Sequence, residues 1–177
     1  MRKVGVTAVL ALAAGALIVG AHGFAGGNKT MLTSDPLTGY QEGNGVSSPA
    51  SGSFSARIDD DSSTIEYTLT YAGLTAPASA SHVHFGNRYT SGGVSFFLCG
   101  GGGKPACPAG TTSEATVTGT VTPADVIGPA GQGIAAGEFD EIVQAMRAGV
   151  SYANVHTATF PGGEIRGQIN DDDQRQP

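Results

Sequence analysis

Three histidines carry the chemistry that this sequence offers most clearly. His82 and His84 stand two residues apart within residues 79–85, a segment whose composition is typical of a β-strand. Side chains at that spacing on a strand share one face, with about 6.5 to 7 Å between them along the backbone. His156 lies on a second predicted strand, residues 152–158. Because imidazole is a good ligand for copper and zinc, we predict a Cu or Zn site formed by these three histidines.

A metal-free interpretation of the same residues stays open. Histidines on strands also occur as partly exposed residues that hydrogen-bond to water or to a neighbouring carbonyl. A His-x-His pair arises readily by chance. The two interpretations differ in one geometric respect, which is whether neighbouring strands bring the three imidazoles to a common point.

The first 25 residues have the pattern of an export signal. Met1-Arg2-Lys3 supplies a positive start, and residues 4–19 form a run of about 16 residues without a charge. Such a run is shorter than the roughly 20 apolar residues that span a bilayer, which favours cleavage over a retained anchor. Cleavage fits after Ala21 or after Ala25. We therefore expect residues 1–25 to be a signal peptide, no stable membrane span after cleavage, and a mature protein that is secreted or held in the cell envelope.

The two cysteines and the net charge narrow the function classes further. Cys99 and Cys107 enclose residues 100–106, which begin with four glycines, so we predict a disulfide between them in an oxidising compartment. Their spacing does not fit a reactive or metal-binding CxxC pair. The formal net charge of −6, with no basic stripe, argues against nucleic acid as a partner.

The elements that must position the histidines are mostly short strands. Residues 26–51 are rich in turn-forming residues and are expected to form an N-terminal edge strand and a loop. Residues 52–170 are expected to form the rest of a β-sandwich, and residues 171–177 a disordered tail. Alternating or β-branched segments predict seven strands, at residues 53–58, 64–71, 79–85, 94–98, 114–121, 152–158 and 164–170.

One helix interrupts this series of strands. Phe139, Ile142, Val143 and Met146 follow the i, i+3, i+4, i+7 spacing of one helical face. The apolar stripe is expected to cover one end of the strands. The pattern as a whole predicts an all-β fold, an antiparallel sandwich or barrel with one short covering helix.

Four segments of the chain resemble the chordin-type (CHRD) domain family. They are residues 37–42 (LTGYQE), 81–86 (SHVHFG), 152–157 (YANVHT) and 161–169 (PGGEIRGQI). The resemblance extends over about residues 30–170. It implies an exported domain with a β fold and an extracellular partner of unknown identity, and it supplies no defined activity.

A second resemblance, confined to a shorter stretch, concerns copper chemistry. The run from His82 to Gly86 is similar to the His-Val-His segment that supplies two copper ligands in copper/zinc superoxide dismutases, which are eight-stranded Greek-key proteins. This similarity implies an antiparallel Greek-key β-sandwich of the superoxide dismutase kind, copper, His156 as a further ligand and Arg166 as an anion-guiding residue. The fourth histidine ligand and the zinc-binding loop of those enzymes are missing here.

The strand that carries Arg166 supports a different interpretation of that residue. Glu164, Arg166 and Gln168 alternate with apolar or small residues, which predicts a solvated outer face rather than an anion guide. The hypothesis that best fits the whole sequence is an exported binding module with a three-histidine copper or zinc site. A copper-only oxidoreductase of the superoxide dismutase kind and a metal-free structural or adhesive domain are the two alternatives, and an enzyme is less favoured than a binding module.

Overall fold

The protein is described by a computed structural model that covers Met1 and residues 29–169. The rest of the predicted signal peptide and the predicted tail lie outside these described residues. The strands are β1 (Lys29–Thr38), β2 (Ser51–Asp59), β3 (Thr64–Ala72), β4 (Ala78–Phe85), β5 (Gly93–Cys99), β6 (Ala115–Val121), β7 (Ser151–Thr157) and β8 (Ile165–Gln168). Within the same residues, one α-helix, α1 (Phe139–Arg147), and three 3-10 helices, η1 (Gly39–Gln41), η2 (Pro123–Asp125) and η3 (Ala130–Gln132), lie between the strands.

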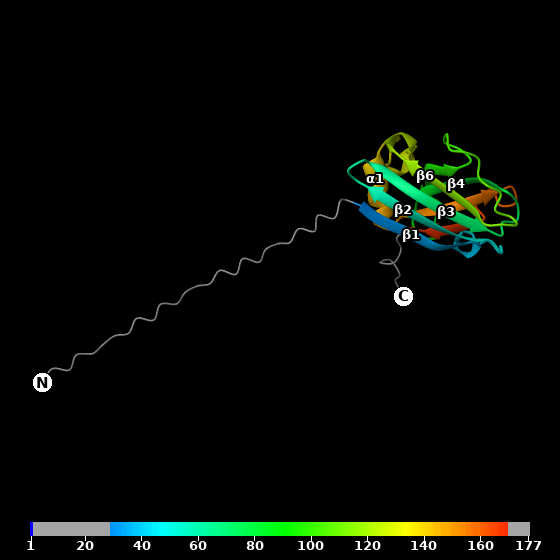
Figure 1. The fold of residues 1–177 in the computed structure, drawn as a ribbon, viewed down its shortest axis with the longest axis horizontal. Coiled ribbons are helices and arrows are strands. Elements are labelled where there is room, and N and C mark those ends of the chain that lie inside the picture. Colours follow the sequence, from blue (N-terminus) through cyan, green and yellow to red (C-terminus); the bar gives the residue numbers. More distant parts are fainter. Residues whose placement is uncertain (2–28, 170–177) are drawn as a thin grey trace.

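These eight strands belong to one antiparallel sheet with the order β5-β4-β7-β8-β1-β2-β3-β6. The terminal strands of this order, β5 and β6, contact each other, so the sheet curves back on itself toward a barrel (Figure 1). The predicted all-β antiparallel fold with one short helix is confirmed. The Greek-key sandwich of the superoxide dismutase kind stays a prediction.

Strand β1 lies inside this order, whereas the sequence predicts an edge strand. It pairs with β2 along most of its length, and Thr38 at its end faces Arg166 of β8. The remaining β-strand predictions agree with the structure to within two residues at most of their ends. The composition of residues 26–51 predicted a strand but held no information about β8, which is more than a hundred residues away.

The interior of the curved sheet is apolar because strands alternate their side chains between two faces. On β4 and β7 the inward residues are Val83, Ala153 and Val155, which are fully buried in the core. The opposite face of the same two strands carries the histidines. Strand β7 is therefore buried on both faces, whereas the outer face of β4 is only partly covered.

Helix α1 covers one end of the core, as its apolar stripe predicted (Figure 1). Arg147 in its last turn donates from Nη2 to the Asp60 carboxylate at 2.7 Å, which ties the helix to the turn between β2 and β3. The buried side chains of the helix are those of Phe139, Ile142, Val143, Ala145 and Met146. No helix in the described part of the chain is long and apolar enough to cross a membrane.

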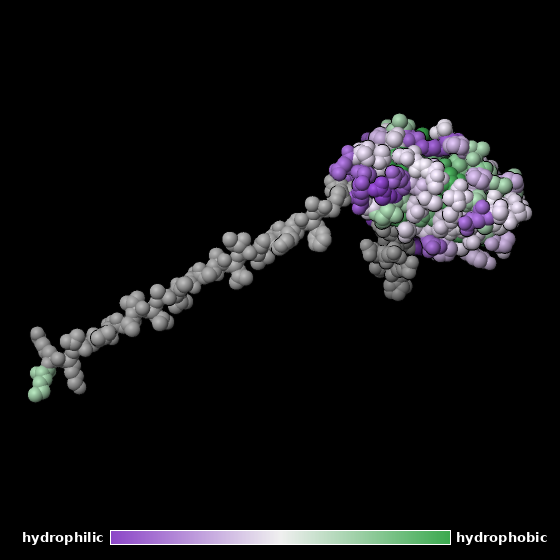
Figure 2. Space-filling model, viewed as in Figure 1, coloured by the Kyte–Doolittle hydropathy of each residue, from purple (hydrophilic) through white to green (hydrophobic). Residues whose placement is uncertain are grey.

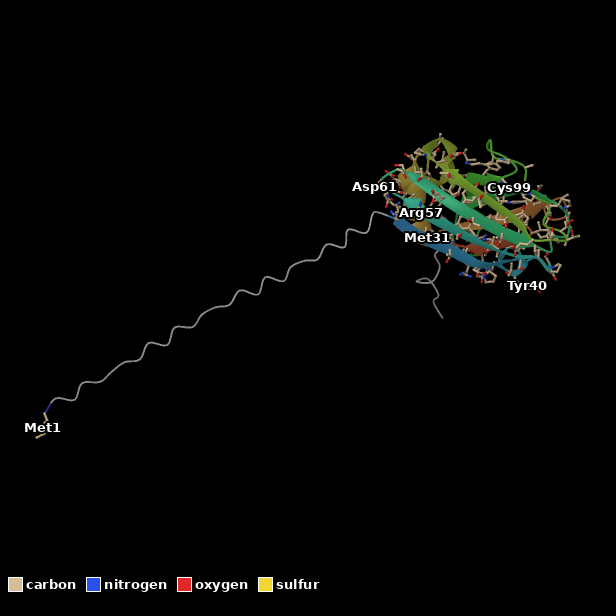
Figure 3. The ribbon with its side chains drawn as sticks, viewed as in Figure 1. Met1, Met31, Tyr40, Arg57, Asp61 and Cys99 are labelled. Atoms are coloured by element: carbon tan, nitrogen blue, oxygen red, sulfur yellow. A yellow bond between two sulfur atoms is a disulfide. The ribbon has the colours of Figure 1, made fainter. Side chains whose placement is uncertain are left out.

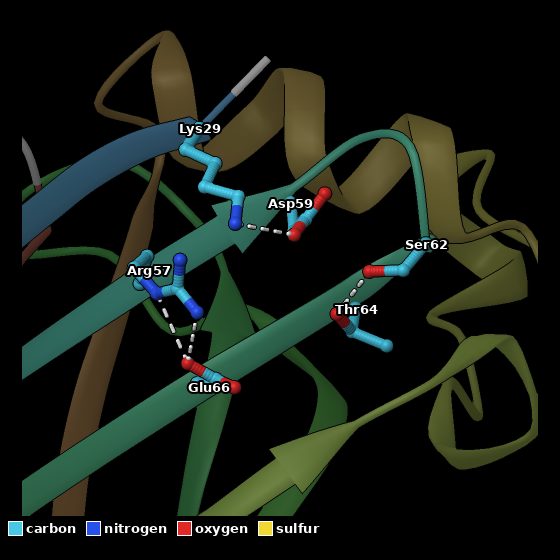
Figure 4. A network of polar contacts seen from close by, with 6 residues as sticks. All are labelled: Lys29, Arg57, Asp59, Ser62, Thr64 and Glu66. Carbon is cyan, nitrogen blue, oxygen red and sulfur yellow. Dashed lines mark hydrogen bonds and ion pairs between the residues drawn. The ribbon is translucent and has the colours of Figure 1, made fainter. Parts of the chain in front are cut away.

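Charged side chains link the strands at this end of the sheet (Figure 4). Lys29 lies 3.3 Å from the Asp59 carboxylate, and Arg57 donates to Glu66 across β2 and β3 at 2.7 Å. Strongly hydrophilic side chains gather here on the surface in Figure 2, at the end that Asp61 marks in Figure 3. Such exposed pairs each contribute little to stability, about 0 to 1 kcal/mol, so they serve mainly to keep this end soluble.

Cys99 and Cys107 form a disulfide, as their spacing predicted. The bond closes the glycine-rich loop that follows β5. The chain beyond it is held by Tyr71, whose hydroxyl donates to the Pro108 carbonyl at 2.6 Å. The loop is therefore fastened to the sheet at two points.

Replacing both cysteines by serine is expected to lower the free energy of unfolding by about 2.5 kcal/mol, because the unfolded chain regains the freedom of a short closed loop. Urea unfolding of the oxidised protein and of the Cys99→Ser/Cys107→Ser variant measures the difference. An unchanged midpoint would contradict the stabilising role of the bond.

Candidate metal centre

The pairing of β4 with β7 brings the three histidines together. His82 lies opposite Asn154, and Ala80 lies opposite His156, so the imidazoles of residues 82 and 156 meet diagonally on one face of the sheet. The His82 and His156 ring centroids are 4.7 Å apart, and those of His82 and His84 are 5.4 Å apart. One ligand nitrogen from each of the three residues lies within 4.8 Å of the others. The convergence that the metal hypothesis requires is present.

A backbone carbonyl determines the tautomer of His156. Its Nδ1 lies 3.0 Å from the Pro161 carbonyl oxygen, which can only accept, so Nδ1 carries the proton. The Nε2 atom of the neutral ring is then an acceptor. Nδ1 of His82 donates to it at 3.1 Å.

A second carbonyl determines the tautomer of His84. Its Nδ1 donates to the Gly92 carbonyl oxygen at 2.9 Å, which leaves Nε2 unprotonated. This Nε2 is buried and has no hydrogen-bond partner among the described residues. The ring itself stacks on Tyr152, with the planes 3° from parallel and the centroids 4.7 Å apart. An oriented, buried and unpartnered nitrogen is what a metal ligand requires before its metal binds.

Burial keeps all three imidazoles neutral. Desolvation lowers the pKa of His82 to about 3, and repulsion from His156 and His84 adds to this shift. Desolvation lowers the pKa of His84 to about 4; repulsion from His156 and Arg166 adds to this shift, and the hydrogen bond to Gly92 and the Asn154 side chain oppose it. Burial also lowers the pKa of His156. His84 and His156 are only 8% and 9% exposed, whereas His82 is half-buried and offers the access from solvent. Neutral imidazole is the form that binds a metal ion.

The spacing of the nitrogens fits copper or zinc after a small adjustment. Two ligands at metal–nitrogen distances of about 2.0 to 2.1 Å lie about 2.9 to 3.4 Å from each other, depending on the angle at the metal. The 3.1 Å between His82 Nδ1 and His156 Nε2 is within that range, and His82 can bind the ion through Nδ1 once its proton has moved to its own Nε2. The three ligand nitrogens lie as much as 4.8 Å apart, so one ring must rotate until its nitrogen has moved by about an ångström.

The predicted solvated face of β8 is wrong. Glu164, Arg166 and Gln168 are 0%, 2% and 5% exposed. Gly86 supplies a carbonyl to the Gln168 amide, and Gly149 supplies another, at 2.9 and 2.8 Å. The alternation of polar and apolar residues identified the two faces of the strand correctly. It held no information about the loops that cover the polar face.

Arg166 holds one of those covering loops. Its Nη1 donates to the Thr90 carbonyl and its Nη2 to the Asn87 carbonyl, both at 2.8 Å. Its guanidinium carbon lies 3.3 Å from the centroid of the Tyr152 ring, whose other face is left for His84. These contacts make Arg166 a support for the loop that supplies the Gly92 carbonyl. Because Arg166 is 2% exposed and each terminal nitrogen already donates to this loop, its position disfavours the anion-guiding role that the superoxide dismutase resemblance implied.

Glu164 fastens the turn that supplies the other carbonyl. Its carboxylate accepts hydrogen bonds from Ser48 Oγ, from Thr157 Oγ1 and from both the amide and the hydroxyl of Thr75, at 2.7 to 3.0 Å. These hydrogen bonds lower the pKa of Glu164 although burial opposes them. Glu164 therefore binds residues from three parts of the chain next to the turn that contains Pro161.

Glu42 is a further buried acid that sequence reasoning missed. It is 8% exposed, and its Oε1 has no hydrogen-bond partner among the described residues. Burial raises the pKa of Glu42 to about 7, and attraction to Arg166 only partly opposes this. The one available signal was its place in the segment LTGYQE, which carried no indication of burial.

Comparison with known proteins assigns most of the chain to a family. The family model described as the CHRD domain matches residues 33–169. No curated protein and no solved structure matches the chain. All three histidines, both cysteines and both buried glutamates lie within the matched residues.

The Glu164→Gln variant is expected to be less stable than the wild type by about 2 to 4 kcal/mol at pH 7, because an amide cannot accept all four hydrogen bonds. A carboxyl whose pKa is lowered by folding contributes stability above its usual pKa of 4.5 and loses it as the pH falls through the folded value. The difference should therefore shrink on acidification. Urea unfolding at several pH values tests this, with Glu141→Gln on the exposed face of α1 as the matched control. Equal stability of both variants at pH 7 would contradict the role given to Glu164.

The Glu42→Gln variant is expected to be more stable than the wild type above pH 7. Below the usual value of 4.5 the carboxyl is neutral in both states; between 4.5 and about 7 the unfolded chain releases its proton first, so wild-type stability declines as the pH rises. Two and a half pH units correspond to a gain of about 3 kcal/mol for the neutral amide. Unfolding curves at acidic and alkaline pH measure it, and a variant that is destabilised at alkaline pH would show that Glu42 has a partner there.

Proposed function

Because the chain belongs to the CHRD domain family, we propose that it is an extracellular binding module that holds a copper or zinc ion between His82, His84 and His156. The observation that carries this proposal is the buried, unpartnered Nε2 of His84 beside the other two imidazoles. The disulfide between Cys99 and Cys107 supports a location in an oxidising compartment.

The chain's own residues prepare the site without the ion. The carbonyl oxygens of Gly92 and Pro161 hold the protons of His84 and His156 on Nδ1, so both Nε2 atoms are unprotonated. That of His84 is unpartnered among the described residues, and that of His156 accepts a hydrogen bond from His82 that a bound ion would replace. Tyr152 supports the His84 ring from one face, and Arg166 supports Tyr152. Such contacts behind the ligands raise their basicity and fix their direction.

The three nitrogen donors limit which metal ions can bind. Three neutral nitrogen ligands suit Cu(II) and Zn(II), whereas calcium and magnesium require oxygen ligands. When bound, the ion would act as a Lewis acid. It would keep at least one coordination position open, because the histidines occupy three. A ligand donated by an extracellular partner fits that position, since His82 gives the site its opening to solvent.

A catalytic use of the same ion is the second candidate. The set of three protein ligands among the described residues favours it, since sites with three ligands and an open position are typical of catalytic metals. A superoxide dismutation assay on copper-loaded protein tests it. Activity above that of an equal amount of free copper supports the oxidoreductase, and activity at or below that level removes it.

The metal proposal itself is tested by stoichiometry. We expect the purified wild-type chain to bind close to one equivalent of Zn(II) or Cu(II) by calorimetry, and the His82→Ala/His84→Ala variant to bind at least about tenfold more weakly, since two of three ligands are gone. Cobalt(II) added to the wild type should give visible absorption bands of a low-coordinate nitrogen site.

The Glu141→Gln variant is the control, because it removes an exposed charge on α1 and leaves the histidines intact. It should bind as the wild type does. Equal and substoichiometric metal in all three proteins would overturn the metal site and leave a structural or adhesive module.

A further inference from the structure

A pocket of about 220 Å³ lies outside the loops that hold His84 and His156. Its lining includes Glu42, Asn44, Ser91, Phe160 and Pro161. It is at the end of the molecule where η1 lies, which Tyr40 marks in Figure 3, opposite the end covered by α1. Its size is below the roughly 300 to 1,000 Å³ of pockets for drug-sized ligands, so it suits a group of a few heavy atoms.

Glu42 supplies the one charged group that the described residues contribute to the lining of this pocket. The residue is more than nine-tenths buried, and its Oε1 has no hydrogen-bond partner among the described residues. Its carboxylate packs directly on Gly163, where φ is +124° and where any added side chain would collide with Oε1. The carboxylate therefore lies against the backbone of Gly163, another residue of the lining, with Oε1 covered and without a donor.

The neighbouring cation does not satisfy Glu42. Arg166 attracts it electrostatically, but both terminal nitrogens of Arg166 donate to the carbonyls of Thr90 and Asn87. The remaining lining residues are uncharged. A buried carboxylate left in this state is unfavourable, and a cation bound in the pocket would offset that cost.

From this cavity and its unpartnered acceptor we propose that the pocket binds a primary ammonium group carried on a short aliphatic chain. A hard metal ion is a poorer match, because calcium takes six to eight oxygen ligands and the lining holds a single carboxylate. The unpartnered atom is one oxygen, which suits the compact charge of an ammonium better than the fork of a guanidinium. Phe160 in the lining supplies an aromatic surface, against which either the aliphatic chain or the cation can pack.

The site is separate from the proposed metal centre, although the two share a support. Pro161 lines the pocket, and its carbonyl oxygen accepts the hydrogen bond from His156 Nδ1. Ser91 also lines the pocket, and it precedes Gly92, whose carbonyl oxygen accepts the hydrogen bond from His84 Nδ1. The ammonium group is expected to bind whether or not a metal ion is present. A failure to bind the ammonium group would therefore not count against the metal centre, and a failure to bind metal would not count against the ammonium pocket.

The test is a titration of the isotope-labelled, metal-free chain with n-butylammonium at about pH 8 and constant ionic strength, followed by amide NMR shifts. We expect saturable shifts at Gly43 and Gly163. Glu42→Gln should weaken binding at least about tenfold, since a charge-assisted hydrogen bond is lost. The Glu141→Gln control should bind as the wild type does, and the neutral isostere butan-1-ol should give no saturable shift.

A second arm uses an N-acetylated, C-amidated lysine, in which the same ammonium group is carried by a peptide unit. Tighter binding of this compound assigns the pocket to a lysine side chain of a partner, and equal binding assigns it to a free small amine. No saturable shift with either amine, equal affinity in Glu42→Gln, or equal binding of butan-1-ol would overturn the proposal.

Discussion

Everything at the candidate centre depends on one constraint, which is that buried polar groups must find partners. The outer face of β4, β7 and β8 is polar, yet it is covered by loops on β7 and β8 and in part on β4. The covering residues meet the constraint with backbone carbonyls, two of which belong to Gly92 and Pro161. Because a carbonyl only accepts, it assigns the proton of each facing imidazole to Nδ1. Satisfying the loops thus leaves the Nε2 atoms of His84 and His156 unprotonated, within a group of three imidazoles whose ligand atoms lie within 4.8 Å of one another.

The same constraint explains the charged residues behind the centre. Arg166 and Glu164 are fully buried, and each is satisfied by groups from distant parts of the chain. Arg166 holds the loop that contains Gly92, and Glu164 holds the turn that contains Pro161. Seven buried side-chain atoms of the described residues have no partner, and we connect two of them with ligands: His84 Nε2, which lies among imidazoles, and Glu42 Oε1, which belongs to a residue that lines a pocket. We regard these two unpartnered atoms as the functional features of the molecule.

Periodicity alone was sufficient to locate the strands, the helix and the shared face of His82 and His84, because each of these depends on neighbours in the sequence. The pairing of β4 with β7 depends on contacts across some seventy residues, so the sequence could suggest convergence with His156 without establishing it. The burial of Arg166 and Glu42, and the interior place of β1, depend on covering loops and remote strands. No local pattern encodes them, and for Arg166 the local pattern pointed the other way.

The central claim is that backbone carbonyls preset the histidines for a metal ion. Long-range nitrogen–proton correlation NMR of the metal-free protein at neutral pH measures the tautomer of each imidazole directly. The account predicts neutral rings with the proton on Nδ1 for His84 and His156, and therefore an unprotonated Nε2 on both. Protons on Nε2 of either ring, or charged imidazolium rings, would contradict it.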